Sequence, residues 1–190
     1  MFKTSLFLIL ATLLLFGVGY PLAIWGIGKL TPHTATGKPV ERDGKIIGFE
    51  NIGQSFHSPQ YFWGRPSAVG YDASSTGGSN YGPSNPDFLS TVQQRIDTLL
   101  FYHPGKTAAD IPVELVTASG GGLDPHISKA AALFQAERVA RARNMDVRGL
   151  TGLIEKQTKG PYLGLFGPKE LINVLKLNLA LDELPQSSQQ

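Results

Sequence analysis

The sequence contains no cysteine among its 190 residues. Disulfide bonds, thiolate metal sites, a cysteine nucleophile and a lipid-modified cysteine are therefore excluded. The absence of thiols suits a location outside the cytoplasm, where a free thiol would be oxidised, although many cytosolic chains also lack cysteine. Composition thus removes several kinds of chemistry without fixing the compartment.

An excess of charge of one sign is also missing. The formal net charge is +2, and once Lys3 and Lys29 are set aside, the 15 remaining basic residues balance 15 acidic ones. Proteins that bind DNA or RNA need a basic surface to neutralise phosphates. We therefore exclude nucleic acid as a partner.

The motifs of common catalytic sites are absent too. The chain has no G-x-x-x-x-G-K-[ST] phosphate loop and no G-x-S-x-G nucleophile turn. Its histidines lie too far apart in sequence to form a metal pair on one helix. They are His33, His57, His103 and His126. Asp124-Pro125-His126 resembles an acid–base pair, but an Asx turn leading into a helix explains it more simply. We expect no catalytic residue, no metal site and no cofactor bound by this chain.

What is present begins with a long apolar run. Residues 4–28 carry no charge, and as a helix rising about 1.5 Å per residue they cover the roughly 30 Å core of a bilayer. Tyr20 and Trp25 lie toward one end, where such rings prefer the membrane interface. Glycines and a proline within 17–21 predict a kink or a neighbouring helix. The run is longer than the roughly 7–15 apolar residues of a signal peptide and has no A-x-A cleavage site. We predict that residues 1–30 are a transmembrane anchor.

The charges that flank this run favour one orientation. Lys3 precedes it, whereas Lys29, Lys38, Arg42 and Lys45 follow it. Cytoplasmic flanks are usually richer in Lys and Arg, so the count taken alone favours a cytoplasmic location for the rest of the chain. A bias of so few residues is easily overridden.

The remaining chain divides into three parts. Residues 31–45 are polar and contain Pro and Gly, which predicts a juxtamembrane linker, and residues 185–190 form a polar tail. Residues 46–184 are long enough for one domain with its own core. We find no internal repeat.

Periodicity and capping residues predict an α+β domain. The predicted strands are 46–49 and 111–119. The first two predicted helices are 86–101, after the cap Asn85, and 129–143, between Ser128 and Asn144. A third follows the cap Asp146 and has Val147, Leu150 and Ile154 on its buried side. A fourth is predicted at 168–184, although its alternating leucines are also compatible with a strand.

Residues 57–87 form a long segment rich in Pro, Gly, Ser and Asn. Loops of this length are usually functional or docking segments. Its aromatic residues are Tyr61, Phe62, Trp63, Tyr71 and Tyr81. A solvated linker would not carry so many rings, so we expect the segment to be ordered against a surface.

Two glycine-rich loops could bind an anion through consecutive backbone N–H groups. They are Gly77-Gly78-Ser79-Asn80 and Gly120-Gly121-Gly122. Neither is followed by the lysine of a nucleotide loop. Tight turns are favoured, and contact of ATP with Gly77, Gly78, Ser79 and Asn80 remains the alternative.

Three arginines, Arg138, Arg141 and Arg143, crowd one predicted helix. Arg138 and Arg141 are three residues apart and share a face. Basic residues in a last turn complement the helix dipole. Docking to an acidic partner surface is the alternative.

Seven short motifs then occur in a specific order. They are IGQSF (52–56), YFWGRPSA (61–68), SN (79–80) with PSNP (83–86), PVELVTAS (112–119), GLDPHIS (122–128), RVARAR (138–143), and NVL (173–175) through NLALD (178–182). Each motif alone is weak. In this order they resemble the C subunit of the potassium-transporting Kdp P-type ATPase over nearly the whole chain, whereas the anchor and residues 31–45 match only in character.

The resemblance implies a non-catalytic accessory subunit of a high-affinity potassium uptake complex in the cell membrane. Its partners would be a potassium-translocating A subunit, an ATP-hydrolysing B subunit and a very small fourth peptide. The family is described as needed for assembly and as a catalytic chaperone that raises the ATP affinity of the B subunit. Its soluble domain lies outside the cytoplasm, so such an effect on ATP would have to be allosteric.

With these partners, we expect the aromatic segment to lie on the A subunit and the transmembrane helix to pack beside it. The docking candidates are Phe62, Trp63, Arg65, Tyr71, Tyr81, Arg138 and Arg141. The alternative is a membrane-anchored module with a cytoplasmic domain that contacts ATP directly through its glycine-rich loops.

Overall fold

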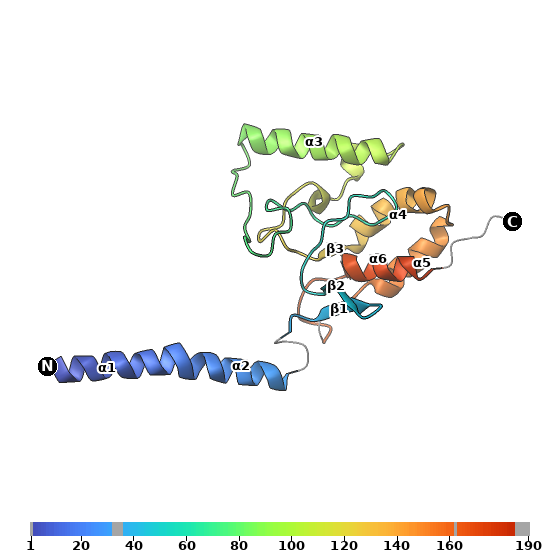
Figure 1. Cartoon of the computed structure of the whole chain (residues 1–190). Helices are drawn as coiled ribbons and strands as arrows, with labels where there is room; N and C mark the ends of the chain where they lie inside the picture. The colour runs from blue at the N-terminus through green and yellow to red at the C-terminus, as the bar shows by residue number, and fades with distance from the viewer. Residues whose placement is uncertain (1, 32–35, 162, 185–190) are drawn as a thin grey trace. The chain divides into compact units, whose positions relative to one another are not determined.

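The computed structural model describes residues 2–31, 36–161 and 163–184 (Figure 1). The chain divides into two compact units, Met1–Phe49 and Glu50–Gln190. Each unit is described by itself. The fold mixes helices with short strands, as the sequence predicts.

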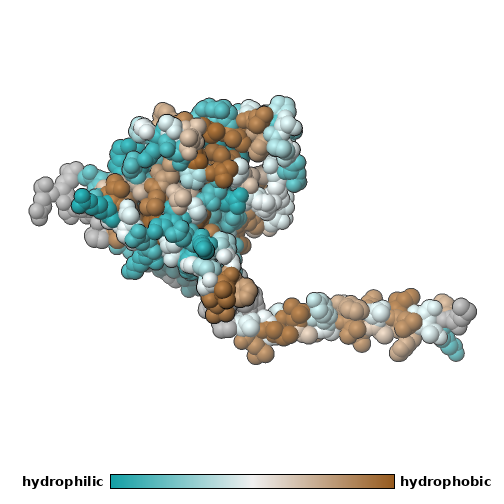
Figure 2. Space-filling model, turned by 180° about the vertical axis from the view of Figure 1, so that it is seen from behind, coloured by the Kyte–Doolittle hydropathy of each residue, from teal (hydrophilic) through white to brown (hydrophobic). Residues whose placement is uncertain are grey.

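The first unit starts with an apolar helix. It consists of α1 (Phe2–Leu14), a π-helical turn (Leu15–Gly19) and α2 (Tyr20–Leu30). The π-helical turn ends two residues before Pro21, which has no N–H group to donate to the preceding turn. Figure 2 shows apolar residues along much of the visible face of this helix, and no residue of Phe2–Leu30 is buried. The helix is long and apolar enough to cross a bilayer, as predicted.

A β-hairpin completes this unit. Strand β1 (Pro39–Arg42) pairs antiparallel with β2 (Lys45–Phe49). Asp43 and Gly44 join them, both with positive φ, as a two-residue hairpin turn requires. The predicted strand at 46–49 is confirmed, and part of the segment predicted to be a linker is a strand.

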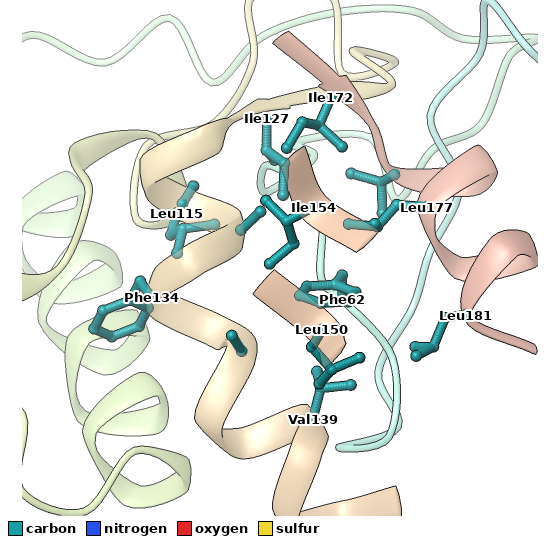
Figure 3. Packing of buried hydrophobic residues seen from close by; sticks show 14 of the residues in the cluster. Phe62, Leu115, Ile127, Phe134, Val139, Leu150, Ile154, Ile172, Leu177 and Leu181 are labelled. Carbon is teal, nitrogen blue, oxygen red and sulfur yellow. The ribbon is translucent and has the colours of Figure 1, made fainter. Parts of the chain in front are cut away.

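The second unit is built on four helices and a short strand pair. The helices are α3 (Pro86–Tyr102), α4 (Lys129–Arg143), α5 (Val147–Gln157) and α6 (Val174–Asp182). Strand β3 (His126–Ser128) pairs antiparallel with β4 (Leu171–Asn173), with Ile127 opposite Ile172. Helix α5 packs against α4 and α6. Between them lies the core, in which Phe62, Leu150 and Ile154 are fully buried (Figure 3).

The predicted helix caps are confirmed. The side chain of Asn85 accepts hydrogen bonds from the N–H groups of Asp87 and Phe88, and Ser128 and Asp146 cap α4 and α5 in the same way. Asn144 ends α4 in the left-handed conformation. These residues satisfy backbone groups that a helix end leaves unpaired, so the helix boundaries can be predicted from the sequence.

Three predictions about elements are wrong. Residues 111–119 form no strand and contain the 3₁₀ turn Val113–Leu115. Leu115 and Val116 are buried one after the other, and no strand among the described residues pairs with this segment. The last helix begins at Val174 and not near 168, because the residues before it pair with β3. Val147 is exposed rather than on the buried side of α5.

Gly53 offers a test of this packing. A Cβ atom there would lie 2.6 Å from the backbone oxygen of Asp124, whereas Gly149 in α5 has open space around it. Gly53→Ala should lower the free energy of unfolding by about 1–3 kcal/mol, and the control Gly149→Ala should raise it by up to about 1 kcal/mol. Urea denaturation of the full chain in detergent micelles measures both. Equal stability of the two variants would contradict this packing.

Candidate docking surface

The aromatic segment around Phe62 runs extended through the second unit without a strand partner. The side chain of Asn178 accepts a hydrogen bond from the Phe62 N–H at 2.9 Å and donates one to its carbonyl at 3.0 Å. Gln135 does the same for Trp63, at 2.8 and 3.0 Å. Two amide side chains thus replace the backbone bonds of a neighbouring strand. They hold the backbone of Phe62 and Trp63 in place and so set the direction of these two rings.

Arg138 closes the same arrangement from α4. Its guanidinium donates to the carbonyls of Pro59 and Tyr61 and, at 2.7 Å, to the Gln135 side chain. It also lies 4.0 Å from the centre of the Trp63 ring. Burial and the nearby Arg141 lower the pKa of Arg138 to about 10, so it is still a cation at neutral pH. Among the residues that the structure describes, no carboxylate forms an ion pair with it.

His103, the C-cap of α3, connects this cluster to that helix. Its Nε2 accepts a hydrogen bond from Arg138 Nε at 3.3 Å, so Nδ1 carries the proton and donates to the Leu99 carbonyl at 2.7 Å. Its ring stacks on Phe134. Burial lowers the pKa of His103, and the positive charge of Arg138 adds to this effect. The histidine is therefore held neutral.

A second cluster, which contains an ion pair, anchors the start of the segment. Arg143 donates to the Gln60 carbonyl at 2.8 Å and pairs with Asp182 of α6 at 2.6 Å. The Tyr61 hydroxyl donates to the other oxygen of that carboxylate, and its ring lies under the guanidinium at 4.7 Å. Segment, α4 and α6 are thereby joined by charge-assisted bonds.

Two depressions open beside this rigid segment. A cleft of about 600 Å³ is lined by residues of the segment and of α3, among them Trp63, Tyr71, Arg95 and Tyr102. A shallower depression of about 310 Å³ is lined by Phe101, Arg141 and others, and Tyr102 borders both. The Trp63 and Tyr102 rings meet edge to face at 5.2 Å and form the wall between the two.

Hydrogen bonds hold the cleft side at Tyr71. The Tyr71 hydroxyl donates to the Arg65 carbonyl, and Arg65 pairs with Asp124 at 3.1 Å. Burial raises the pKa of Tyr71, and the Asp124 charge raises it further. The His126 ring near Asp124 is the first cause of that carboxyl's lowered pKa. Asp124 also accepts from the His126 N–H at 3.0 Å, which confirms the predicted Asx turn.

The two glycine-rich loops meet each other. The Gly77 N–H donates to the Gly121 carbonyl at 3.2 Å, and a Cβ on Gly78 would lie 2.8 Å from the Gly120 oxygen. Gly122 has positive φ and lies against Val69 and the Gly77 carbonyl. Glycine is needed here for close backbone approach, and one of the N–H groups that an anion would need is already used.

The comparisons with known proteins agree with this layout. A family model described as "K+-transporting ATPase, c chain" matches residues 2–183, which include the apolar helix, the aromatic segment and all four helices of the second unit. The chain belongs to the KdpC family.

Curated relatives in the KdpC family match over nearly their whole length. A potassium-transporting ATPase KdpC subunit from Flavobacterium johnsoniae is 51% identical, covering 91% of this chain and 92% of the relative. One from Janthinobacterium sp. is 52% identical and one from Phocaeicola vulgatus 44% identical, each covering 96% of this chain and 97% of the relative. The resemblance inferred from the ordered motifs is confirmed.

The structure changes how two docking candidates of this KdpC-family chain are interpreted. Phe62 is 0% and Arg138 2% exposed, so both support the interior and neither reaches a partner's surface. Trp63 and Tyr71 are half-buried and line the cleft, whereas Arg65 is half-buried and pairs with Asp124. The exposed docking candidates are Tyr81 and Arg141, and among the candidates for ATP contact Ser79 and Asn80 are exposed.

Sequence analysis missed three residues that shape the site. Gln135 and Asn178 are buried polar residues on α4 and α6, and Tyr102 separates the two depressions. A signal for the first two exists: each is an amide placed among apolar residues of a helix. A buried amide requires partners, but the sequence does not say which.

Replacing Asn178 tests the amide clamp. Asn178→Leu keeps the branched shape of the side chain, although leucine is somewhat larger, and leaves the buried N–H and carbonyl of Phe62 without these partners, so the free energy of unfolding should fall by about 2–4 kcal/mol. Urea denaturation of the full chain in micelles measures it. The control Asn51→Leu, at an exposed position, should change stability by less than about 0.5 kcal/mol. A loss no larger than the control's would contradict the clamp.

The lowered pKa of His103 predicts that the stability of the protein depends on pH. Because its pKa is lowered on folding, the unfolded chain takes up a proton first as pH falls. The free energy of unfolding should be constant above about pH 7.5 and should fall below about pH 6.5, by at most about 1.4 kcal/mol per pH unit. Urea denaturation between pH 5 and 8 measures this slope. His103→Gln should flatten it and the exposed-residue control His57→Gln should not; an unchanged slope in His103→Gln would disprove the assignment.

Proposed function

We propose that this chain is a non-catalytic accessory subunit of an ATP-driven potassium-transporting ATPase. The observation that carries the proposal is the family match, which extends over residues 2–183 and so includes both the apolar helix and the folded unit. The partners are the potassium-translocating A subunit, the ATP-hydrolysing B subunit and a small fourth peptide. The chain is needed for assembly and is anchored in the cell membrane by residues 1–30.

The folded domain lies outside the cytoplasm in this proposal. The lack of cysteine supports that side, and the excess of Lys and Arg after the apolar helix opposes it weakly. A domain outside the cytoplasm cannot touch ATP bound inside. Raising the ATP affinity of the B subunit therefore requires two states of that subunit, one of which this chain binds more tightly.

Direct contact with ATP is the less favoured alternative. It would use the loop around Gly77, whose N–H already bonds to the Gly121 carbonyl. Close packing of the two loops accounts for their glycines without a ligand. ATP then acts on this chain only through the complex.

The A subunit docks over the cleft and its rim. The ring of Phe101 is 78% exposed beside the shallow depression, and Tyr81 is 47% exposed near the start of α3. Arg141 adds a charge at the rim, with its guanidinium held by the Tyr102 carbonyl at 2.9 Å. Exposed rings around a concave, rigid surface are typical of a protein interface.

Phe101 provides the test of docking. Phe101→Ser should weaken association with the A subunit about tenfold or more, because burying such a ring contributes about 1.5–3 kcal/mol. The measurement is recovery of this chain with a tagged A subunit from membranes that contain the whole complex. Val113, 70% exposed outside both depressions, gives the control Val113→Ser. Unchanged recovery of both variants would reject this surface.

A further inference from the structure

An apolar loop projects from the second unit between α5 and β4. Leu163, Leu165 and Phe166 are 74%, 81% and 65% exposed. None of the three belongs to the cleft or the shallow depression. In water such a cluster of large apolar side chains is unfavourable, so it requires an explanation.

The base of this loop is closed by backbone hydrogen bonds. The Lys159 N–H donates to the Leu171 carbonyl at 2.8 Å, and the Leu171 N–H donates back at 3.0 Å. Within the loop, the Gly164 N–H donates to the Pro161 carbonyl, and both Gly164 and Gly167 have positive φ. The loop is therefore a closed projection whose apolar side chains lie beyond a fixed base.

Lysines outnumber carboxylates near that base. Residues 155–170 contain Lys156, Lys159 and Lys169 against Glu155 and Glu170, and the Glu155 carboxylate pairs with Lys129 at 3.4 Å. The Lys159 side chain is 64% exposed, and its Nζ lies 3.8 Å from a Glu50 oxygen, whereas Lys176 holds the other oxygen at 2.8 Å. Lysines next to an apolar tip can place their alkyl chains along it and their ammonium groups at a polar boundary.

The chain also limits how far the domain can move from a membrane. Only eight residues, 31–38, lie between the end of α2 and the start of β1. Fully extended, eight residues span at most about 30 Å. For a helix that crosses the bilayer, the lipid surface is thus always within reach of the folded part, and even weak binding to lipid is effective.

We propose that Leu163, Leu165 and Phe166 of this loop insert into the interface of the bilayer that anchors the chain, with the flanking lysines on anionic headgroups. An apolar tip flanked by lysines matches the surface of a bilayer with anionic lipids, whose interior is apolar and whose headgroups are negatively charged. A hydrophobic protein groove would not need the lysines. The inference rests on the proposed anchor and is independent of docking to the A subunit.

A single nitroxide label tests the insertion, since the chain has no cysteine of its own. Leu165→Cys carries the label in the loop. Ser75→Cys, in an exposed polar loop, is the water control, and Leu10→Cys reports on the anchor. The full chain is reconstituted, without other subunits, into phosphatidylcholine vesicles with or without phosphatidylglycerol. Accessibility to oxygen is compared with accessibility to a water-soluble nickel complex by electron paramagnetic resonance.

The label at 165 should be more accessible to oxygen than to nickel, as at position 10, while the label at 75 shows the reverse. The substitutions Lys159→Gln and Lys169→Gln should lower the ratio of inserted to withdrawn loop about fivefold for each lysine replaced. Removing phosphatidylglycerol should lower the same ratio. If position 10 lies in lipid but position 165 behaves as position 75, the insertion is rejected and the anchor stands. Protection of position 165 only when the A subunit is added would also reject it. If position 10 is in water, both ideas fail.

Discussion

Hydrogen bonds from side chains to the backbone of the Phe62 segment determine the rest of the folded unit. An extended segment buried without a neighbouring strand would leave its N–H and carbonyl groups unpaired, at a cost of about 1–3 kcal/mol each. Asn178, Gln135 and Arg138 supply those partners from α6 and α4. The same bonds place the Phe62 ring in the core and set the Trp63 ring against the guanidinium of Arg138.

A buried arginine paired with carbonyls and a ring gives this site its rigidity. Among the described residues Arg138 has no carboxylate in an ion pair, so four acceptors and the face of Trp63 offset the cost of removing its charge from water. Its contact with His103 extends the network to α3, where Arg141 also binds the Tyr102 carbonyl. The wall of the cleft is thus fixed by contacts made deep inside, which suits a surface that must stay in shape before a partner arrives.

Local signals in the sequence predicted the local parts of this fold. Asn85, Ser128 and Asp146 were legible as caps because each satisfies backbone groups within three residues. The β-branched run at 111–119 led to a wrong prediction, because a strand depends on a distant partner and not on local sequence alone. Among the described residues, no strand pairs with this run. Arg138 and Phe62 were predicted to dock a partner but are buried. Neither composition nor spacing shows that two parts of the chain about 75 positions apart meet and bury these side chains. Only a buried amide such as Gln135 hinted that a backbone partner had to exist.

In the proposed function, the two units divide the tasks of membrane anchoring and partner binding. Polar side chains that line the cleft, such as Arg95 and Thr98, already bond within the domain, so the proposed docking gains mainly from burying exposed rings such as Phe101 and Tyr81. A few rings alone give modest affinity once the entropy of association is subtracted. Confinement by an apolar helix raises the effective concentration of membrane partners, so modest affinity is enough. In this proposal the anchor strengthens assembly by raising the local concentration of the folded unit near its partners. The apolar helix and the cleft therefore have to be carried by the same chain.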